Sequence, residues 1–303
     1  MIKFRVLGNA SPAVMGAIWM MLAACLLGVL SLLARKISAD LHPFEVAFFR
    51  NFAQFVLMLP WLAVMGLNIM RTKRVWAHIR RSSFGILGMM SLFWVLPKMP
   101  IAEVTAIAFS APLFTTLGAA LFLREPVGQR RWFATMSGFI GVLIIIRPGF
   151  QEVGQVQLVA VMAAVLIAGA MLSNKSLSKT ENPNAMVLWM GFFMSLFSLP
   201  SALAVWQWPT GETWGWLLLL GIVATTAHVV LNQAYSMGDV SYIAPYGFVQ
   251  IPFVAVLGYM LYGETPDMWT WVGASIIIGA GIYTAHREAK HKRALNSGVL
   301  QQV

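Results

Sequence analysis

Charge and cysteine are both scarce in this 303-residue chain, and each shortage excludes a class of protein. Only 11% of the residues are charged, against about 25% in a typical soluble domain. Hydrophobic residues make up 59% of the chain, and the mean hydropathy is +0.74. The single cysteine, Cys25, provides neither a disulfide framework nor a cysteine-based metal site. Composition therefore excludes a cytosolic enzyme, a disordered chain and a disulfide-stabilised secreted domain, and it indicates a membrane protein with several spans.

Acidic residues are also few, 11 against 21 lysines and arginines, so the formal net charge is +10. An excess of bases is found in nucleic-acid-binding proteins, but bases beside long apolar runs are more typical of the cytoplasmic loops of membrane proteins. We therefore expect the lipid bilayer to be a partner of this chain and expect no nucleic acid.

Ten apolar runs are candidates for spanning a bilayer, which takes about 20 residues. The runs are Ala13–Ala34, Phe44–Met65, Phe84–Leu96, Ile101–Leu123, Trp132–Ile146, Val156–Ser173, Ala185–Trp206, Trp214–Tyr235, Val240–Tyr262 and Met268–Ala285. The third and fifth are short, and we expect them to extend into their polar flanks. The first is too long for a cleavable signal peptide and lacks a small-residue cleavage site. The sequence therefore predicts an all-α membrane protein with ten transmembrane helices.

Lysine and arginine gather on one side of the predicted membrane. With a cytoplasmic N-terminus, sixteen bases fall in cytoplasmic segments, four fall outside and Arg50 lies within the membrane. The sixteen are Lys3, Arg5, Arg71, Lys73, Arg74, Arg80, Arg81, Arg124, Arg130, Arg131, Lys175, Lys179, Arg287, Lys290, Lys292 and Arg293, and the four are Arg35, Lys36, Lys98 and Arg147. Because basic loops translocate poorly, both termini are predicted to be cytoplasmic.

The two halves of the chain match each other at an offset of 140 residues. The matched prolines are Pro43 with Pro183 and Pro60 with Pro200. Each copy holds five predicted helices, and an odd number inverts the second copy in the membrane. Inverted repeats are common in transporters, where the substrate binds near the midplane between the halves. We predict two inverted five-helix repeats, residues 13–147 and 156–286, followed by a basic cytoplasmic tail at 287–303.

Short motifs accompany this repeat in both halves. They are His42–Asn51, Phe109–Phe114, Leu123–Pro126 and Gly138–Gly149 in the first half, and Ala244–Tyr246 and Leu261–Glu264 in the second. Together they resemble the drug/metabolite transporter (DMT) superfamily, in its ten-helix branch with two EamA domains. Within that branch the chain looks most like the bacterial S-adenosylmethionine and riboflavin uptake carriers.

The resemblance implies a function in the bacterial inner membrane. A protein of this kind would be a secondary carrier that moves a small organic metabolite, riboflavin or an S-adenosylmethionine-like solute, by alternating access. An amino-acid or drug exporter of the same fold is the alternative, because the motifs do not separate these groups. The direction of transport also stays open, since a carrier runs down whichever gradient exists.

Polar and aromatic side chains inside the predicted membrane supply the candidate substrate site, because ionisable groups there are costly and often functional. Arg50 could bind an anionic part of a substrate, or it could donate to backbone carbonyls and hold helix ends together. His228 and Asn232 share one predicted helix face, as do Tyr246 and Gln250. The full candidate set is Arg50, Phe93, Trp94, Phe109, Ser110, His228, Asn232, Tyr246 and Gln250.

The character of this set suggests its ligand. Aromatic faces stack on planar rings, and amides recognise the donors and acceptors at ring edges. With few fixed charges, such a site favours a bulky, mostly neutral or zwitterionic metabolite over a phosphorylated sugar. Pro112 beside these residues frees a backbone carbonyl and predicts a break in the fourth helix.

Motifs of competing functions are absent from the sequence. There is no Walker phosphate loop, GxSxG or HExxH motif, so we expect no enzyme, no cofactor and no bound metal. An intramembrane enzyme or a scaffold is the rival class. All 11 acids lie in loops or near helix ends, which favours facilitated diffusion or exchange over obligatory proton symport. His228 is the exception to watch, because histidine titrates near neutral pH.

Two further expectations concern packing at helix ends and faces. Glu125 and Glu264 close the fourth and ninth runs, and each is predicted to cap the helix that follows, where an acid opposes the helix dipole. Small residues at Ser137/Gly141 and Ser275/Gly279 have the spacing that packs membrane helices closely. These pairs could join the two halves or support a homodimer.

Overall fold

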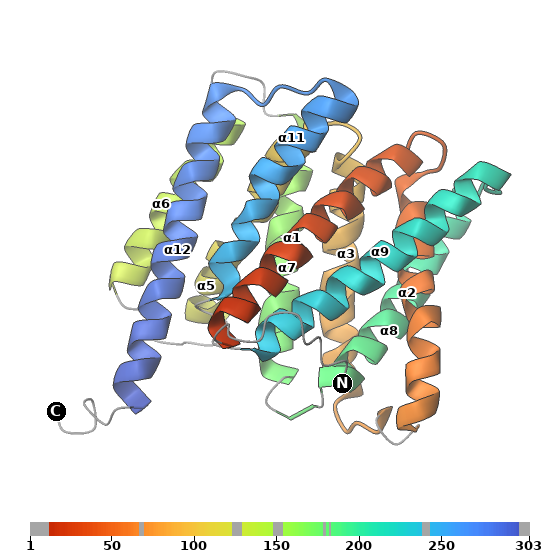
Figure 1. Cartoon of the computed structure of the whole chain (residues 1–303), viewed down its shortest axis with the longest axis horizontal. Helices are drawn as coiled ribbons and strands as arrows, with labels where there is room; N and C mark the ends of the chain where they lie inside the picture. The colour runs from red at the N-terminus through yellow and green to blue at the C-terminus, as the bar shows by residue number, and fades with distance from the viewer. Residues whose placement is uncertain are drawn as a thin grey trace.

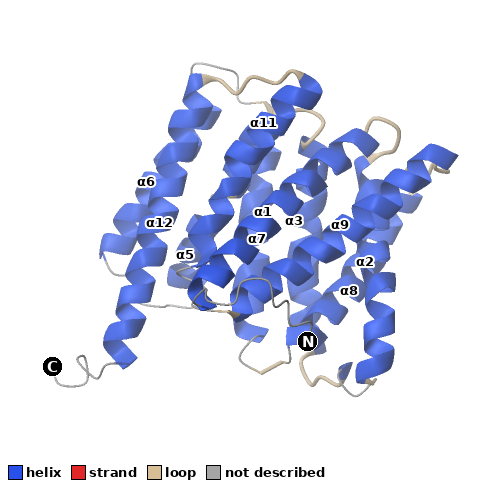
Figure 2. Ribbon diagram, viewed as in Figure 1, coloured by secondary structure: helices blue, strands red, loops and turns tan. Residues whose placement is uncertain are grey.

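The computed structural model describes residues 12–66, 70–122, 129–147, 154–177, 180–181, 183–237 and 243–296, and every regular element within these ranges is a helix (Figure 2). The α-helices are α1 (Pro12–Ile37), α2 (Pro43–Met65), α3 (Val75–Val95), α4 (Ile101–Ala108), α5 (Ala111–Phe122), α6 (Gln129–Ile146), α7 (Gln155–Leu177), α8 (Pro183–Leu203), α9 (Gly211–Ser236), α11 (Gln250–Tyr262) and α12 (Met268–Asn296). A 3₁₀ helix, η2 (Ala244–Val249), directly precedes α11. The all-α prediction is confirmed.

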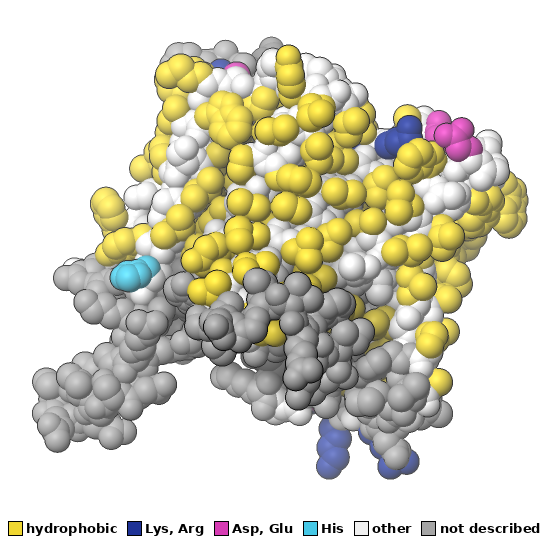
Figure 3. Space-filling model, in the orientation of Figure 1, with side chains coloured by type: hydrophobic (Ala, Val, Ile, Leu, Met, Phe, Trp, Pro, Cys, Tyr) yellow, Lys and Arg dark blue, Asp and Glu magenta, His cyan; other side chains and the backbone are white. Residues whose placement is uncertain are grey.

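Six described stretches are long and apolar enough on their own to cross a bilayer. They are Val14–Ile37, Ile101–Gly118, Gln155–Asn174, Ala185–Leu203, Gly211–Tyr235 and Pro245–Tyr262. Shorter apolar segments of α6 and α12 and the helices α2 and α3 complete the bundle. Counting α4 with α5, and η2 with α11, as one span each, the described helices form the ten predicted spans. Hydrophobic side chains are spread over the whole described part of the face shown in Figure 3.

Helices of the two halves interlock instead of forming separate bundles (Figure 1). Helix α3 packs along α7, and α1 packs along α9. Likewise α2 contacts α9, and α3 contacts α8. If every span is replaced by its equivalent in the other repeat, five spans away, the α3–α7 contact becomes the α1–α9 contact and the α2–α9 contact becomes the α3–α8 contact. The same replacement leaves the α2–α8 and α6–α12 contacts unchanged. This pattern is the one that a two-fold axis between inverted repeats produces.

The two ends of the bundle are distinguished by their polar contacts. At one, the Glu264 end, Arg35 in the last turn of α1 forms an ion pair with Glu264, which follows α11. At the other, the Arg74 end, Nη1 of Arg74 just before α3 donates to the carbonyl oxygen of Ser176 near the end of α7 (3.0 Å). The start of α1 and the end of α12 both lie at the Arg74 end (Figure 1).

Helices α6 and α12 approach each other closely through glycine. A Cβ atom on Gly273 would lie 2.5 Å from the carbonyl oxygen of Gly141, and one on Gly141 would lie 2.8 Å from that of Gly273. By contrast, a Cβ on Gly279 would meet nothing within 4 Å. The two halves therefore pack through Gly141. This contact agrees with the interpretation that the small residues join the two halves. On α12, however, Gly273 makes the contact in place of the expected Ser275/Gly279 pair.

The extension of the third run and the break beside Pro112 occur as expected, whereas the end of the last run differs from the prediction. Helix α3 begins at Val75 and not at Phe84, because its first turns carry polar residues that hide them from a search for apolar runs. The fourth run is broken after Ala108, and Pro112, which lacks an N–H donor, lies in the first turn of α5. Helix α12 continues to Asn296, into the stretch predicted as a tail, whose last residues lie outside the described ranges.

Candidate functional site

A cavity of about 490 Å³ lies between helices of the two repeats, where α4 of the broken α4–α5 span meets α11. Residues of α1, α2, α3 and α4 line it from the first repeat, and residues of α7, α8, α9 and α11 line it from the second. Pockets for metabolites in proteins typically measure about 300–1,000 Å³. Its polar lining residues are Ser31, Arg50, Arg81, Thr105, Asn174, His228 and Gln250.

Arg50 is the central polar group of this cavity and is only 5% exposed. Its Nη2 atom lies 2.6 Å from Nε2 of His228, and its Nη1 atom donates to Oδ1 of Asn51 (2.7 Å) and to Sδ of Met89 (3.3 Å). Because a guanidinium only donates, Nε2 of His228 must accept, so the imidazole is neutral and carries its proton on Nδ1. The Nε atom of Arg50 is buried and has no hydrogen-bond partner among the described residues.

Arg81 lines the same cavity from the second turn of α3, although it was predicted to lie in a cytoplasmic segment outside the membrane. Its Nε atom is buried without a hydrogen-bond partner in the described structure, and so is Oδ1 of Asn174 on α7. Neither Arg81 nor Asn174 belonged to the predicted site. No carboxylate is among the described residues that line the cavity.

The rest of the lining is apolar and rich in thioethers. Met89, Met171, Met190 and Met194 line it together with Phe93 and Phe109. The Phe109 ring packs against Phe248, with ring centroids 5.0 Å apart. Methionine is flexible and polarisable, so it adapts to ligands of irregular shape and contacts aromatic rings favourably. The cavity thus offers a large apolar surface with a few charged and polar donors.

The structure brings five of the nine predicted site residues together in this lining, namely Arg50, Phe93, Phe109, His228 and Gln250. Trp94 instead lines a separate groove of about 630 Å³ between α2, α3, α7 and α8. Ser110 is fully buried in the α4–α5 break, where its hydroxyl donates to the carbonyl oxygen of Ile107. The side chain of Asn232, on α9, lies outside the described part of the chain.

Tyr246 packs beside Met20 and Ile243, away from the cavity lining. The prediction grouped it with Gln250 because four residues separate them, which brings side chains to one face of an α-helix. Here the intervening residues form η2, and a 3₁₀ helix has three residues per turn. The two side chains therefore leave the backbone in different directions.

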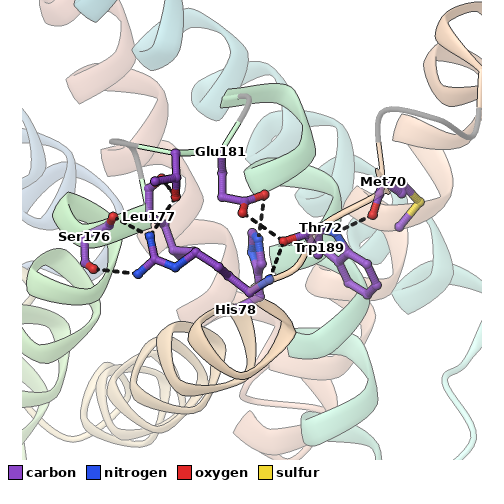
Figure 4. Close-up of polar contacts among 9 residues, drawn as sticks. Met70, Thr72, His78, Ser176, Leu177, Glu181 and Trp189 are labelled. Carbon is purple, nitrogen blue, oxygen red and sulfur yellow. Dashed lines mark hydrogen bonds and ion pairs between the residues drawn. The ribbon is translucent and has the colours of Figure 1, made fainter.

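A polar cluster at the Arg74 end fixes the start of α3 (Figure 4). Oγ1 of Thr72 donates to Oε1 of Glu181 (2.8 Å), and Nε2 of the buried His78 lies 3.5 Å from Oε2 of the same carboxylate. Nε1 of Trp189 on α8 donates to the carbonyl oxygen of Met70 (3.2 Å). These contacts hold the α2–α3 connection against the second repeat, and so they help to position the helix that carries Arg81.

A second polar cluster, at the Glu264 end, joins the start of α4 to the segment that follows α11. Oε2 of Glu264 accepts from the backbone N–H of Ile101 (3.0 Å), the first residue of α4. Glu264 was predicted to cap the helix that follows it. It caps α4, a helix of the first repeat, instead. Helix α12 is capped by Asp267, whose Oδ1 accepts from the backbone N–H of Thr270 (2.8 Å). Glu125, the counterpart of Glu264, lies outside the described residues.

Comparison with known proteins accounts for this architecture. The model of the EamA-like transporter family matches residues 14–147 and 155–285. The chain belongs to this family. A riboflavin transporter of Rhizobium johnstonii is 32% identical over 286 residues, which cover 93% of this chain and 95% of that protein. An S-adenosylmethionine uptake transporter of Rickettsia bellii is 32% identical over 272 residues, which cover 90% and 94%.

A solved crystal structure shares the fold, with a TM-score of 0.63 at 18% identity over 91% of this chain and 98% of the other. The predicted resemblance to the DMT superfamily is confirmed. This EamA-like protein is therefore a multi-pass membrane transporter of the bacterial inner membrane, with ten helices in two inverted five-helix repeats.

Proposed function

We propose that this EamA-like protein is a secondary carrier that moves a small organic metabolite through the central cavity by alternating access. The observation that supports this proposal is the position of the cavity: both repeats line it, where the broken α4–α5 span meets α11. Transporters built from inverted repeats bind their substrates at such junctions, and rocking one repeat against the other exposes the site to each side in turn.

Riboflavin is the first candidate solute, ahead of S-adenosylmethionine. The flavin ring is flat and largely apolar, with acceptor atoms along one edge. Phe93, Phe109 and the methionines provide surfaces for the ring, and Arg50 and Gln250 provide donors for its edge. S-adenosylmethionine carries a sulfonium and an ammonium group besides its single carboxylate, so its net charge is positive, and a cavity with two arginines and no described carboxylate repels the two cationic groups.

The orientation proposed from the sequence puts the Arg74 end in the cytoplasm. The exposed residues Arg71, Lys73 and Arg80 lie at this end. Basic segments are retained on the cytoplasmic side of membranes, so the first and last described helices would both have their outer ends there. Uptake or export then follows from the solute gradient, because a carrier of this kind works in both directions.

An amino-acid or drug exporter of the same fold is the second candidate. The adaptable thioether lining favours it, since methionine-rich surfaces accept apolar solutes of several shapes. Competition separates the two candidates: an amino-acid exporter would be inhibited by aromatic or aliphatic amino acids, whereas a flavin carrier would be inhibited by flavins and not by amino acids.

Counterflow of labelled riboflavin into proteoliposomes tests the proposal. We expect saturable entry that unlabelled riboflavin trapped inside accelerates. Phe93→Leu, which alters the cavity, should slow this entry strongly. Trp94→Leu is the matched control, because the neighbouring side chain lines the separate groove. Equal rates for both variants would remove the cavity from the mechanism, and absence of counterflow with riboflavin and with amino acids would contradict a carrier.

A further inference from the structure

Two arginines face the central cavity without an acidic partner. Arg50 donates only to neutral groups, namely His228, Asn51 and Met89. Arg81 has no hydrogen bond or ion pair with any described residue, and its Nε atom is buried. The lining therefore carries two positive charges with no described carboxylate to balance them.

The other arginines with described polar contacts are compensated differently. Arg35 forms an ion pair with Glu264, and Arg147 forms one with Asp267. Arg74 uses Nη1 and Nη2 to hydrogen-bond the backbone and hydroxyl oxygens of Ser176. Unlike these arginines, Arg81 lines the cavity without a polar partner among the described residues.

An unpaired guanidinium removed from water is costly, and it is stabilised by an anion that makes charge-assisted hydrogen bonds. A planar guanidinium matches the two oxygen atoms of a carboxylate or phosphate in fork geometry. Of the two arginines, Arg50 has already engaged both of its terminal nitrogens. Arg81 therefore has the donors that a solute could use.

We propose that Arg81 binds an anionic oxygen group, a carboxylate or a phosphate monoester, on the transported solute, and that the carrier prefers planar heterocyclic anions to neutral or cationic analogues. The proposal rests on the carrier function proposed above and names the substrate class of the same cavity. It differs from the mostly neutral or zwitterionic metabolite that the sequence predicts, because the structure adds Arg81 to the cavity lining.

Matched flavins test this preference, because they differ in charge and share the ring. The probes are riboflavin, riboflavin 5′-phosphate and a 10-carboxymethyl flavin, with a 10-(2-aminoethyl) flavin as the cation. Each is used as an unlabelled competitor of labelled riboflavin counterflow in proteoliposomes. We expect both anions to inhibit at lower concentrations than riboflavin and the aminoethyl flavin to inhibit least. A stronger effect of one anion identifies the phosphate or the carboxylate as the preferred group.

Arg81→Gln should raise the half-inhibitory concentration of the preferred anion at least about 10-fold, as expected for the loss of a hydrogen bond to a charged group. The value for riboflavin should change little. Arg81→Lys keeps the charge and should retain part of the preference. Arg80→Gln is the control, because it removes the same charge from the adjacent, exposed position of α3.

Each result bears on one claim. Anions that inhibit no better than riboflavin in the wild-type protein, or a preference that survives Arg81→Gln, would overturn the proposal for Arg81. Equal loss of preference in Arg80→Gln would also overturn it, since the effect would then come from the general charge of this end. Absence of riboflavin counterflow in the wild-type protein would contradict the flavin-carrier function itself.

Discussion

The Nη2 atom of Arg50 lies 2.6 Å from Nε2 of His228, and this contact joins α2 of the first repeat to α9 of the second. Both side chains line the central cavity. A solute that contacts either residue would therefore touch a polar link between the repeats, and movement of one repeat against the other would lengthen or break that link. In the proposed mechanism, this pair would couple substrate binding to the relative position of the two halves.

Loss of the imidazole should impair both stability and transport. In His228→Ala, Nη2 of the buried Arg50 loses its acceptor, and an unsatisfied buried donor costs about 1–3 kcal/mol. His228→Gln supplies an amide oxygen at a similar reach and should recover part of the loss. Thermal unfolding in detergent, together with riboflavin counterflow, measures the two effects. An alanine variant that matches the wild-type protein in both assays would show that the contact has no role.

Transport should not depend on the proton gradient. The described cavity lining holds no carboxylate, and His228 accepts a hydrogen bond from Arg50, so protonation of Nε2 would have to break that bond first. Counterflow at a fixed solute gradient should therefore continue when an uncoupler is added. Collapse of the flux with the uncoupler, and loss of that sensitivity in His228→Gln, would instead identify His228 as a proton carrier.

Much of the fold could be predicted from the sequence because the membrane imposes simple rules. The apolar runs, the repeat and the basic residues predicted ten spans and inverted repeats. The site was less accessible. Arg81 was missed because hydropathy placed the start of its helix at Phe84. One face of α3 carries a row of residues that line the cavity and that begins before Phe84, namely Arg81, Gly85, Met89 and Leu96. This row is the sequence signal that could have identified Arg81.

Tyr246 shows the opposite error, because it was included in the predicted site but lies away from the cavity. Spacing alone cannot distinguish an α-helix from a 3₁₀ helix, and η2 carries Pro245 in its first turn, where a missing N–H costs no helical hydrogen bond. The pairing of Arg50 with His228 was also beyond the sequence, because 178 residues separate them. Contacts between the repeats depend on tertiary packing, which periodicity along one helix does not describe.

The orientation of the bundle is testable with single cysteines. After Cys25→Ala, a cysteine replaces either Lys98, exposed at the Glu264 end, or Lys73, exposed at the Arg74 end. An impermeant maleimide should label Lys98→Cys in cells whose inner membrane is intact. It should label Lys73→Cys only after that membrane is permeabilised. The reverse pattern would invert the proposed topology.

Close packing of α6 on α12 makes the sharpest stability prediction. A methyl group at position 273 would lie 2.5 Å from the carbonyl oxygen of Gly141, a backbone atom that cannot rotate away. Gly273→Ala should therefore separate the two helices and lower the free energy of unfolding by about 1–3 kcal/mol. Gly279→Ala, on the same helix, meets nothing within 4 Å and should be neutral or slightly stabilising. Thermal unfolding of both variants in detergent provides the measurement. If Gly273→Ala were as stable as Gly279→Ala, the two repeats would not meet through these glycines, and the small residues would be available for contacts between two copies of the chain.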